Sequence, residues 1–466
     1  MAKEIRYVKD PDAYLVQHKG DSSASPGSHQ LLMGARVHID PNSQDGDWIT
    51  ANKVPDKQGN IRTGFVKAAH LSTNQVLKIF YLDVGQGDAT LIEAQDAIII
   101  IDGGPNKGFH EELSKRLESL RAADIDAGLQ PKTQLHINAI VVTHFDKDHF
   151  YGLIRVLEDN RFSIGKLYHN GLPRYGKSAG KDLDLGTVVN HNDGTRSIST
   201  DFRGIQSARD LLISGDLLTA NGNDNQFALF LRAMVQAFDN GRLGGVERLF
   251  RRDTAVNVDV IPDTGPDLKL QILSPITTKS TGAVRLPVFP DPHDVTASNP
   301  NPSRSTSHTI NGNSVVLRLV YGNNTFLFGG DLNQPAQKYL EERYGSLSPT
   351  FSAQVNKACH HGSSDFDLPY LESVAPHATV FSSGDDGSYD HPLPDAIGAA
   401  AKHSQGDFPL VFSTELARET SSSKVKLGHI NARSNGQQIV MAQKKEKTTT
   451  RTEWHSFEVP YPGPFG

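Results

Sequence analysis

The chain has 466 residues, of which 37% are hydrophobic and 21% charged, and its formal net charge is −6 at pH 7. This composition excludes a disordered chain and a uniformly basic nucleic-acid coat. Cys359 is the single cysteine, which excludes an intrachain disulfide. No apolar run approaches the roughly 20 residues that cross a bilayer, and the N-terminus lacks the apolar stretch of a signal peptide. We therefore expect a cytoplasmic protein without a membrane partner.

Residues 1–73 are expected to form a polar N-terminal arm followed by a small all-β barrel. The segments LLMGARVHI, DWITANKV and TGFVKAAHLS have the composition of strands and are separated by turns that contain Asp and Gly. Gly34, Trp48 and the closing Gly64–Val66 segment resemble the bacterial SH3-like domain. The resemblance implies a domain through which the chain would bind a protein partner.

From residue 74 onward the pattern is that of a layered α/β domain. VLKIFYLDV, ATLIEA, AIIIIDGG and INAIVVTH are typical of strands, and apolar residues recur at helical spacing between Phe109 and Leu120. LKLQILSPI, SVVLRLVYG and NTFLFGGDL predict three further strands. Residues 172–265 are expected to be largely a helical insertion, with amphipathic helices near Ile205–Leu218 and Gln226–Phe238.

Four residues with metal-binding side chains follow one buried strand in the segment VVTHFDKDHFYG, namely His144, Asp146, Asp148 and His149. Imidazole and carboxylate groups both suit zinc, and carboxylate also suits manganese. A loop that follows a rigid strand can hold such ligands at fixed distances. The spacing therefore predicts a site for two divalent metal ions, zinc or manganese.

Three later segments carry further candidates after apolar strands. Asp331 ends FLFGGDL, and His360 and His361 lie in VNKACHHGSSD. His391 comes shortly before Pro394, a residue that favours the first turn of a helix. Because α/β folds build their sites at the carboxyl ends of strands, we expect these side chains to lie near the first four.

Six ordered motifs resemble those of the metallo-β-lactamase superfamily: LDVGQGDATLI, IIIDGG, VVTHFDKDH, SVVLRLVYGNNTFLFGGDL, KACHHGS, and SSG followed by HPLP. Within the superfamily they are most similar to the soluble catalytic domain of the competence DNA-uptake channel. The resemblance spans Phe80 to about Ala400. It implies that residues 74–466 form an αββα sandwich with a helical insertion, behind the SH3-like barrel.

The resemblance also implies roles for single residues. His144 and Asp146 would hold the first metal, Asp148 and His149 the second, and Asp331 would bridge the two. Either His360 or His361 would complete the second site, and His169 is the candidate third ligand of the first. Four residues would support the site or its substrate: Asp102 as a prop of the ligand loop, Lys357 and His391 as phosphate or substrate contacts, and Ser363 as a substrate contact.

Around the motif DVGQGD we expect a tight turn beside the site, made by Gly85 and Gly87. Asp83 and Asp88 are interpreted as mainly structural. Besides Lys357 and His391, a basic cluster could offer anion partners, and its residues are Arg242, Arg248, Arg251 and Arg252.

The favoured function is a metallohydrolase in which two metal ions activate hydroxide, with Asp148, Lys357 and His391 as catalytic residues. Phosphodiester hydrolysis of nucleic acid or nucleotides is the first hypothesis. Hydrolysis of a small-molecule ester, lactone or amide is the second. A non-catalytic binding module is the third, although nearly all expected ligand positions are filled.

Overall fold

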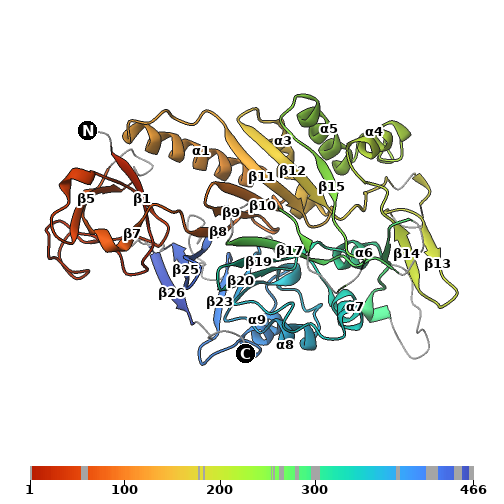
Figure 1. Ribbon diagram of the computed structural model, residues 1–466. Coiled ribbons are helices and arrows are strands. Elements are labelled where there is room, and N and C mark those ends of the chain that lie inside the picture. The colour runs from red at the N-terminus through yellow and green to blue at the C-terminus, as the bar shows by residue number, and fades with distance from the viewer. Residues whose placement is uncertain are drawn as a thin grey trace.

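The computed structural model of the chain describes residues 3–53, 61–176, 179–181, 184–252, 254, 258–261, 267–278, 283–294, 305–384, 389–415, 429–444 and 454–460. Two large β-sheets with their covering helices make up most of it. A smaller N-terminal sheet lies beside them (Figure 1). The class is therefore mixed α/β, as the sequence predicts.

The N-terminal sheet is antiparallel throughout and has the strand order β6-β5-β4-β1-β7. Its strands are β1 (Glu4–Val8), β4 (Arg36–Ile39), β5 (Trp48–Lys53), β6 (Thr63–Lys67) and β7 (Leu71–Ser72), and β2 (Tyr14–Leu15) pairs with β3 (His29–Gln30) beside it.

Three of these strands lie where the sequence predicts them, but residues 1–20 are not simply a polar arm. Glu4–Val8 form β1 between β4 and β7, because Val8 is buried in the apolar cluster of the sheet with Val37 and Val66. The predicted turn at residues 56–60 lies outside the described residues. The assignment to the SH3-like domain stays a prediction.

The first large sheet has nine strands in the order β15-β12-β11-β10-β9-β8-β24-β25-β26. They are β8 (Leu77–Tyr81), β9 (Thr90–Ala94), β10 (Ala97–Ile101), β11 (Leu135–Val142), β12 (Phe162–His169), β15 (Val246–Arg248), β24 (Ile430–Ser434), β25 (Ile439–Lys444) and β26 (Trp454–Val459). The segment with Asn435 and Gly436, a pair typical of hairpin turns, joins β24 to β25.

The second large sheet has seven strands in the order β16-β17-β19-β20-β21-β22-β23. They are β16 (Val258–Asp259), β17 (Leu268–Ser274), β19 (Val316–Tyr321), β20 (Asn324–Phe328), β21 (Val355–Lys357), β22 (Ala378–Phe381) and β23 (Leu410–Ser413). All the strands predicted from residue 76 to residue 328 are present within these two sheets.

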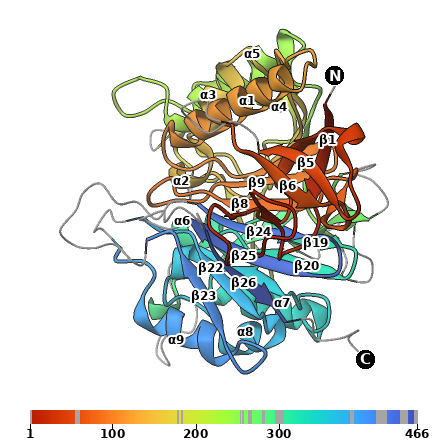
Figure 2. The same cartoon turned by 90° about the vertical axis from the view of Figure 1, so that its left-hand side faces the viewer.

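The two sheets pack face to face, because apolar side chains of both, such as Ile99, Val141 and Phe326, share one buried cluster. Helices α1 (Gly108–Asp126), α3 (Leu153–Glu158) and α5 (Gln226–Asp239) cover the outer face of the nine-stranded sheet. Helices α7 (Gln334–Tyr344), α8 (Leu368–Val374) and α9 (Pro394–Lys402) cover the seven-stranded sheet (Figure 2). The result is a four-layered αββα arrangement.

Residues 172–265 contain α4 (Ile205–Ser214) and α5, close to the two predicted helices. The first helix ends earlier than predicted, because Gly215 adopts a left-handed backbone with φ 77°. The stretch also holds β13 (Val188–Asn190) and β14 (Arg196–Ser199), and the latter pairs with β18 (Arg285–Pro287). Since β15 and β16 join the large sheets, the description as a largely helical insertion stays a prediction.

Aromatic side chains join the base of α5 to the loop that carries the predicted ligands. Phe145, one residue after His144, packs edge-on against Phe227 and also contacts Phe230. The helical layer therefore packs against the back of the ligand loop.

Among the described residues, no helix is both long enough and apolar enough to span a bilayer.

Candidate metal centre

The predicted site lies at one rim of the sandwich, where strands of both sheets end. In the nine-stranded sheet β10 and β11 are parallel, so Asp102 and His144 follow them at the same edge. In the seven-stranded sheet β20 and β21 are parallel, so Asp331 and the histidine pair follow them likewise. The short helices α2 (Lys147–Phe150) and α6 (Thr306–Gly312) lie in the adjoining loops.

Four buried side chains form a compact group at this rim: Asp88, His149, Asp331 and His361. One ligand atom of each lies within 4.8 Å of the others. His149 Nε2 is 3.2 Å from Asp331 Oδ1, and His361 Nε2 is 3.3 Å from Asp331 Oδ2. Asp331 therefore faces both histidines, as expected of a bridging carboxylate.

The other residues of the predicted ligand loop surround this group. Asp148 Oδ2 lies 3.1 Å from His361 Nε2 and 3.9 Å from His149 Nε2. The ring centres of His144 and His149 are 4.1 Å apart, and His144 Nε2 is 3.8 Å from Asp146 Oδ2. The structure thus brings together all four predicted ligands of the HxDxDH segment.

The orientation of the imidazoles fits a divalent cation. His149 Nδ1 is 2.8 Å from Asp102 Oδ2, and His361 Nδ1 is 2.9 Å from the carbonyl oxygen of Ser382. Such contacts on one ring nitrogen fix the tautomer and leave the other free for a metal. The Nε2 atoms of His144 and His149, and Asp331 Oδ1, are buried without a hydrogen-bond partner among the described residues.

Unpartnered buried polar atoms are costly, and nitrogen and carboxylate donors suit zinc or manganese. Metal ions bound by these atoms would remove that cost. The residues present therefore fit the cofactor that the sequence predicts.

The charges within the group are strongly coupled. Burial alone would lower the pKa of His361, but the carboxylates of Asp331 and Asp88 outweigh it and raise that pKa well above its ordinary value. Burial would raise the pKa of Asp331, yet His149 and His361 hold it well below its usual range. Opposite charges thus lie close together in the group, and a metal ion bound there would compete with protons for its ligand atoms.

Asp102 supports the ligand loop as predicted. Its Oδ1 accepts a hydrogen bond of 2.8 Å from the backbone N–H of Thr143, and its Oδ2 accepts one of 2.7 Å from Thr143 Oγ1. Because Oδ2 also contacts His149 Nδ1, a single carboxylate fixes the start of the loop and the orientation of a ligand. Asp102 itself adopts a left-handed backbone with φ 57°, a conformation that residues other than glycine rarely adopt.

Asp88 belongs to the four-residue group although its sequence motif indicates a mainly structural role. The Lys357 ammonium pairs with Asp88 Oδ2 and lies 3.3 Å from the carbonyl oxygen of Gly330. Lys357 is buried, and its expected contact with phosphate stays a prediction. The absence of a side chain at Gly87 lets its backbone lie close to that of Asp148, because a Cβ there would be 2.4 Å from the Asp148 carbonyl oxygen.

The adjacent residues His360 and His361 differ in their position relative to the four-residue group. His361 belongs to the group, whereas His360 Nε2 lies 4.0 Å from Asp331 Oδ2 and 3.3 Å from Asn311 Nδ2. Both have left-handed backbones, with φ 50° and 55°. This paired strain at a short turn is typical of functional sites. The position of the side chains favours His361 as the ligand.

His169 lies outside the four-residue group. Its ring stacks on Phe202 at a centroid distance of 3.8 Å, and its Nδ1 accepts a 3.0 Å hydrogen bond from the backbone N–H of Gly171. Burial, with a smaller effect of Arg248, lowers its pKa to about 3, so the ring is neutral. Its Nε2, like those of His144 and His149, is buried without a hydrogen-bond partner among the described residues, and the expectation that it binds the first metal stays a prediction.

The remaining predicted residues lie at the edge of the site. The His391 ring centre is 6.4 Å from that of His361 and 6.0 Å from that of His360, which fits a substrate contact. Ser363 Oγ instead accepts a hydrogen bond of 3.2 Å from the backbone N–H of Asp365 and stabilises its own turn. Gly85 has a left-handed backbone with φ 82° at a bend of the chain.

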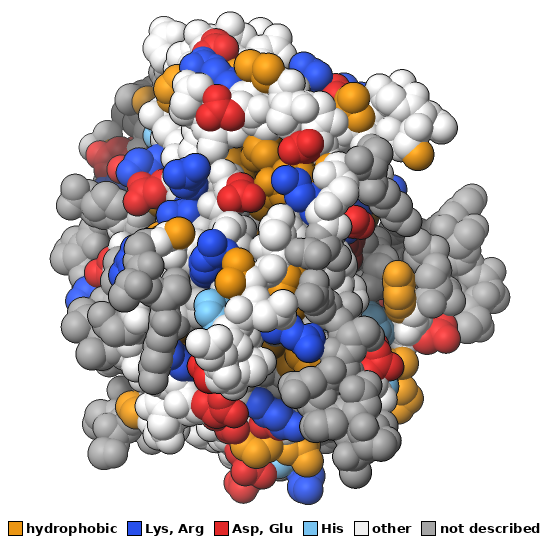
Figure 3. Space-filling view, turned by 90° about the vertical axis from the view of Figure 1, so that its right-hand side faces the viewer, with side chains coloured by type: hydrophobic (Ala, Val, Ile, Leu, Met, Phe, Trp, Pro, Cys, Tyr) orange, Lys and Arg blue, Asp and Glu red, His pale blue; other side chains and the backbone are white. Residues whose placement is uncertain are grey.

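The predicted basic cluster does not form a common anion site. Arg242 donates to three backbone carbonyls, and Arg248 donates to both oxygens of Thr200. Arg251 is buried and donates to a backbone carbonyl and a tyrosine hydroxyl. Arg252 is exposed. On the face in Figure 3, acidic and basic side chains are interspersed among the described residues.

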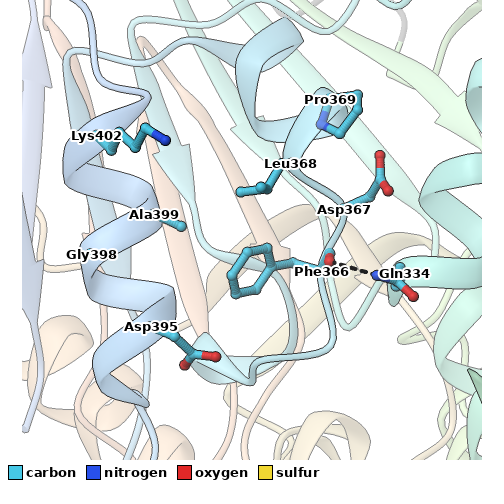
Figure 4. A pocket seen from close by; sticks show the side chains of 9 residues that line it. All are labelled: Gln334, Phe366, Asp367, Leu368, Pro369, Asp395, Gly398, Ala399 and Lys402. Atoms are coloured by element: carbon cyan, nitrogen blue, oxygen red, sulfur yellow. Dashed lines mark hydrogen bonds between the residues drawn. The ribbon is translucent and has the colours of Figure 1, made fainter. Parts of the chain in front are cut away.

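A hollow of about 520 Å³ lies elsewhere, between α8, α9 and the start of α7. Figure 4 shows Phe366 and Leu368 beside Ala399 in it, with Gln334 donating to the carbonyl oxygen of Phe366. None of its lining residues belongs to the metal-ligand group. The hollow and the four-residue group are therefore separate features of the structure.

The family model of the metallo-beta-lactamase superfamily matches residues 82–202. Competence protein ComA from Neisseria gonorrhoeae is 36% identical over 92 residues, which are 20% of this chain and 13% of that protein. The chain therefore covers only a small part of this relative.

Two solved structures are similar over 73% of this chain and 98% of their own. They are the metallo-beta-lactamase fold protein YhfI from Bacillus subtilis, with a TM-score of 0.31 and 8% identity, and a diphosphatase of the PhnP family, with a TM-score of 0.30 and 12% identity. The segment that matches the family model, residues 82–202, supplies Asp88 and His149 to the four-residue group.

Proposed function

We propose that the protein is a metal-dependent hydrolase of phosphodiesters, with nucleic acid or nucleotides as substrates. The observation that carries the proposal is the buried group of two imidazoles and two carboxylates, with His144 and Asp148 at its border. Divalent ions held there would supply a hydroxide nucleophile at neutral pH and stabilise the charge that develops on the attacked group. We expect zinc or manganese.

The chain's own residues then have separate tasks. Asp102 and the Ser382 carbonyl oxygen fix the two imidazoles of the group through their Nδ1 atoms. Asp331 faces both imidazoles and is suited to lie between two ions. His391, at the border of the site, would contact the substrate.

The proposal is tested by measuring bound metal together with the hydrolysis of bis(p-nitrophenyl) phosphate and linear DNA. The wild type should contain metal and hydrolyse the phosphodiester, and Asp148→Ala should lose both metal and activity. A metal-loaded wild type that hydrolyses neither substrate would contradict the phosphodiesterase proposal.

Hydrolysis of a small-molecule ester, lactone or amide remains the second candidate. It is favoured by the net charge of −6 and by the dispersal of the predicted arginine cluster, which offers no extended basic surface. A lactone panel assayed in parallel separates the two functions, since cleavage of lactones alone would support the second.

A further inference from the structure

Arg174 lies in the loop that follows strand β12, and hydrogen bonds hold its backbone in place. The side-chain amide of Asn225, the N-cap residue of α5, donates a hydrogen bond of 2.8 Å to the Arg174 carbonyl oxygen. The next backbone N–H, that of Tyr175, donates to the carbonyl oxygen of Asp184 at 2.6 Å. The start of the Arg174 side chain is therefore fixed by contacts on both sides.

The guanidinium of Arg174 reaches the border of the metal centre. Its Nη1 lies 3.1 Å from Asp146 Oδ1, while the other oxygen, Asp146 Oδ2, is 3.8 Å from His144 Nε2. The Asp146 carboxylate thus lies between the guanidinium of Arg174 and the imidazole of His144. The side chains of Arg174 and Asp146 are 29% and 27% exposed, so solvent reaches part of both.

Among the described residues, the ion pair with Asp146 is the one contact of this guanidinium, so most of its N–H donors are left over. Nη1 is buried, yet its approach to Asp146 does not have the geometry of a hydrogen bond, and it has no other partner among the described residues. A guanidinium carries five N–H donors and no acceptor. Buried donors without an acceptor require an explanation, and an oxyanion supplied by a ligand is one.

We infer that Arg174 binds an anionic oxygen of the substrate, with Asp146 orienting the guanidinium. The planar fork of an arginine matches the oxygens of a phosphate group. A neutral ester or lactone would leave those donors unpaired. This inference deepens the proposed function and rests on it for the reaction, because it assigns the substrate an anionic group beside the scissile bond.

The test compares wild type, Arg174→Gln and Arg174→Lys, with Arg232→Gln as the matched control. Arg232 lies on α5 of the same segment and forms an exposed ion pair with Asp224. Bound metal is determined for each protein, and inorganic phosphate is titrated calorimetrically. The KM for bis(p-nitrophenyl) phosphate is compared with that for neutral p-nitrophenyl acetate.

Arg174→Gln should weaken phosphate binding by about 10- to 100-fold, the range for a lost hydrogen bond to a charged group. The KM for the phosphodiester should rise with the metal content unchanged. Arg174→Lys should recover part of the loss, because it restores the charge but not the fork. Arg232→Gln and the hydrolysis of the neutral ester should stay at wild-type values.

Equal phosphate affinity in wild type and Arg174→Gln would overturn the inference, as would a wild type that binds no phosphate. It would also be overturned if Arg174→Gln lost its metal and Arg174→Lys recovered neither metal nor phosphate binding. Phosphate binding that depends on Arg174 in an enzyme without phosphodiesterase activity would contradict the proposed function alone.

Discussion

The neighbouring residues His360 and His361 offer a matched pair of substitutions. Both have left-handed backbones, so alanine would meet similar strain at either position. His361 lies in the ligand group and His360 does not. We expect His361→Ala to retain fewer metal ions per chain, while His360→Ala keeps the wild-type content, as measured by elemental analysis. The reverse order would assign the ligand to His360.

Asp102 acts on the metal through His149. Replacing the carboxylate by an amide removes the acceptor that fixes the His149 tautomer, and loss of such a partner lowers metal affinity by about 10–100-fold. Asp102→Asn should show this drop in a chelator-competition titration. Asp96→Asn, in the exposed turn before β10, is the control and should bind metal as the wild type does.

Glu93 on β9 anchors a buried charge network that joins three elements. Its carboxylate pairs with Lys78 of β8 at 2.8 Å and with Arg116 of α1 at 2.6 Å. Glu93→Gln would leave the buried Lys78 ammonium without its counter-charge, which costs about 3–5 kcal/mol. The free energy of unfolding in urea should fall by that amount.

Glu118→Gln on the exposed side of α1 is the control and should change the free energy of unfolding by less than about 0.5 kcal/mol. An equal effect of the two substitutions would contradict a special role of the network.

The same carboxylate makes the stability depend on pH. Burial would raise the pKa of Glu93, but Arg116 and Lys78 outweigh it and hold that pKa well below its ordinary value of 4.5. The unfolded chain therefore takes up a proton at this residue first, and the stabilisation is present above about pH 4.5 and lost below it.

Urea unfolding between pH 7 and pH 3 should show a steeper loss of stability for the wild type than for Glu93→Gln. Parallel curves would show that Glu93 does not contribute to the acid sensitivity.

Met33, between β3 and β4, helps to attach the N-terminal part of the chain to the nine-stranded sheet. This fully buried side chain shares an apolar cluster with Val76, Val440 and Ala442 of the large domain. Met33→Ala should lower the free energy of unfolding by about 2–5 kcal/mol, the range for such truncations in a core. Ile125→Ala, whose side chain is 64% exposed on α1, should have little effect. Similar values for both would show that the cluster does not stabilise the junction.

Much of the sandwich and its ligands can be predicted from the sequence, because apolar strands followed directly by His or Asp are local signals. His144 and Asp148 are recognisable within a few residues, and so is Asp331. Asp88 is different, since its position depends on a lysine 269 residues away. A polar residue after a glycine turn gives no local sign of that partner.

The role of an arginine is harder to predict from the sequence than the presence of a ligand motif. Arg242 and Arg251 lie in a basic stretch, yet the fold uses both to bind its own carbonyl oxygens. Arg174 lies outside that stretch and nevertheless reaches the border of the site. Clustering along a chain indicates charge density, whereas the direction of a guanidinium is set by packing that only the folded chain provides.

The ligand group draws on residues 88 and 149 of one sheet and residues 331 and 361 of the other. More than three quarters of the chain must be synthesised before His361, the last residue of the group, is present. A proteolytic fragment that retains one sheet alone would carry half of the group. A cation that needs all four side chains can therefore be captured only in the late stages of synthesis.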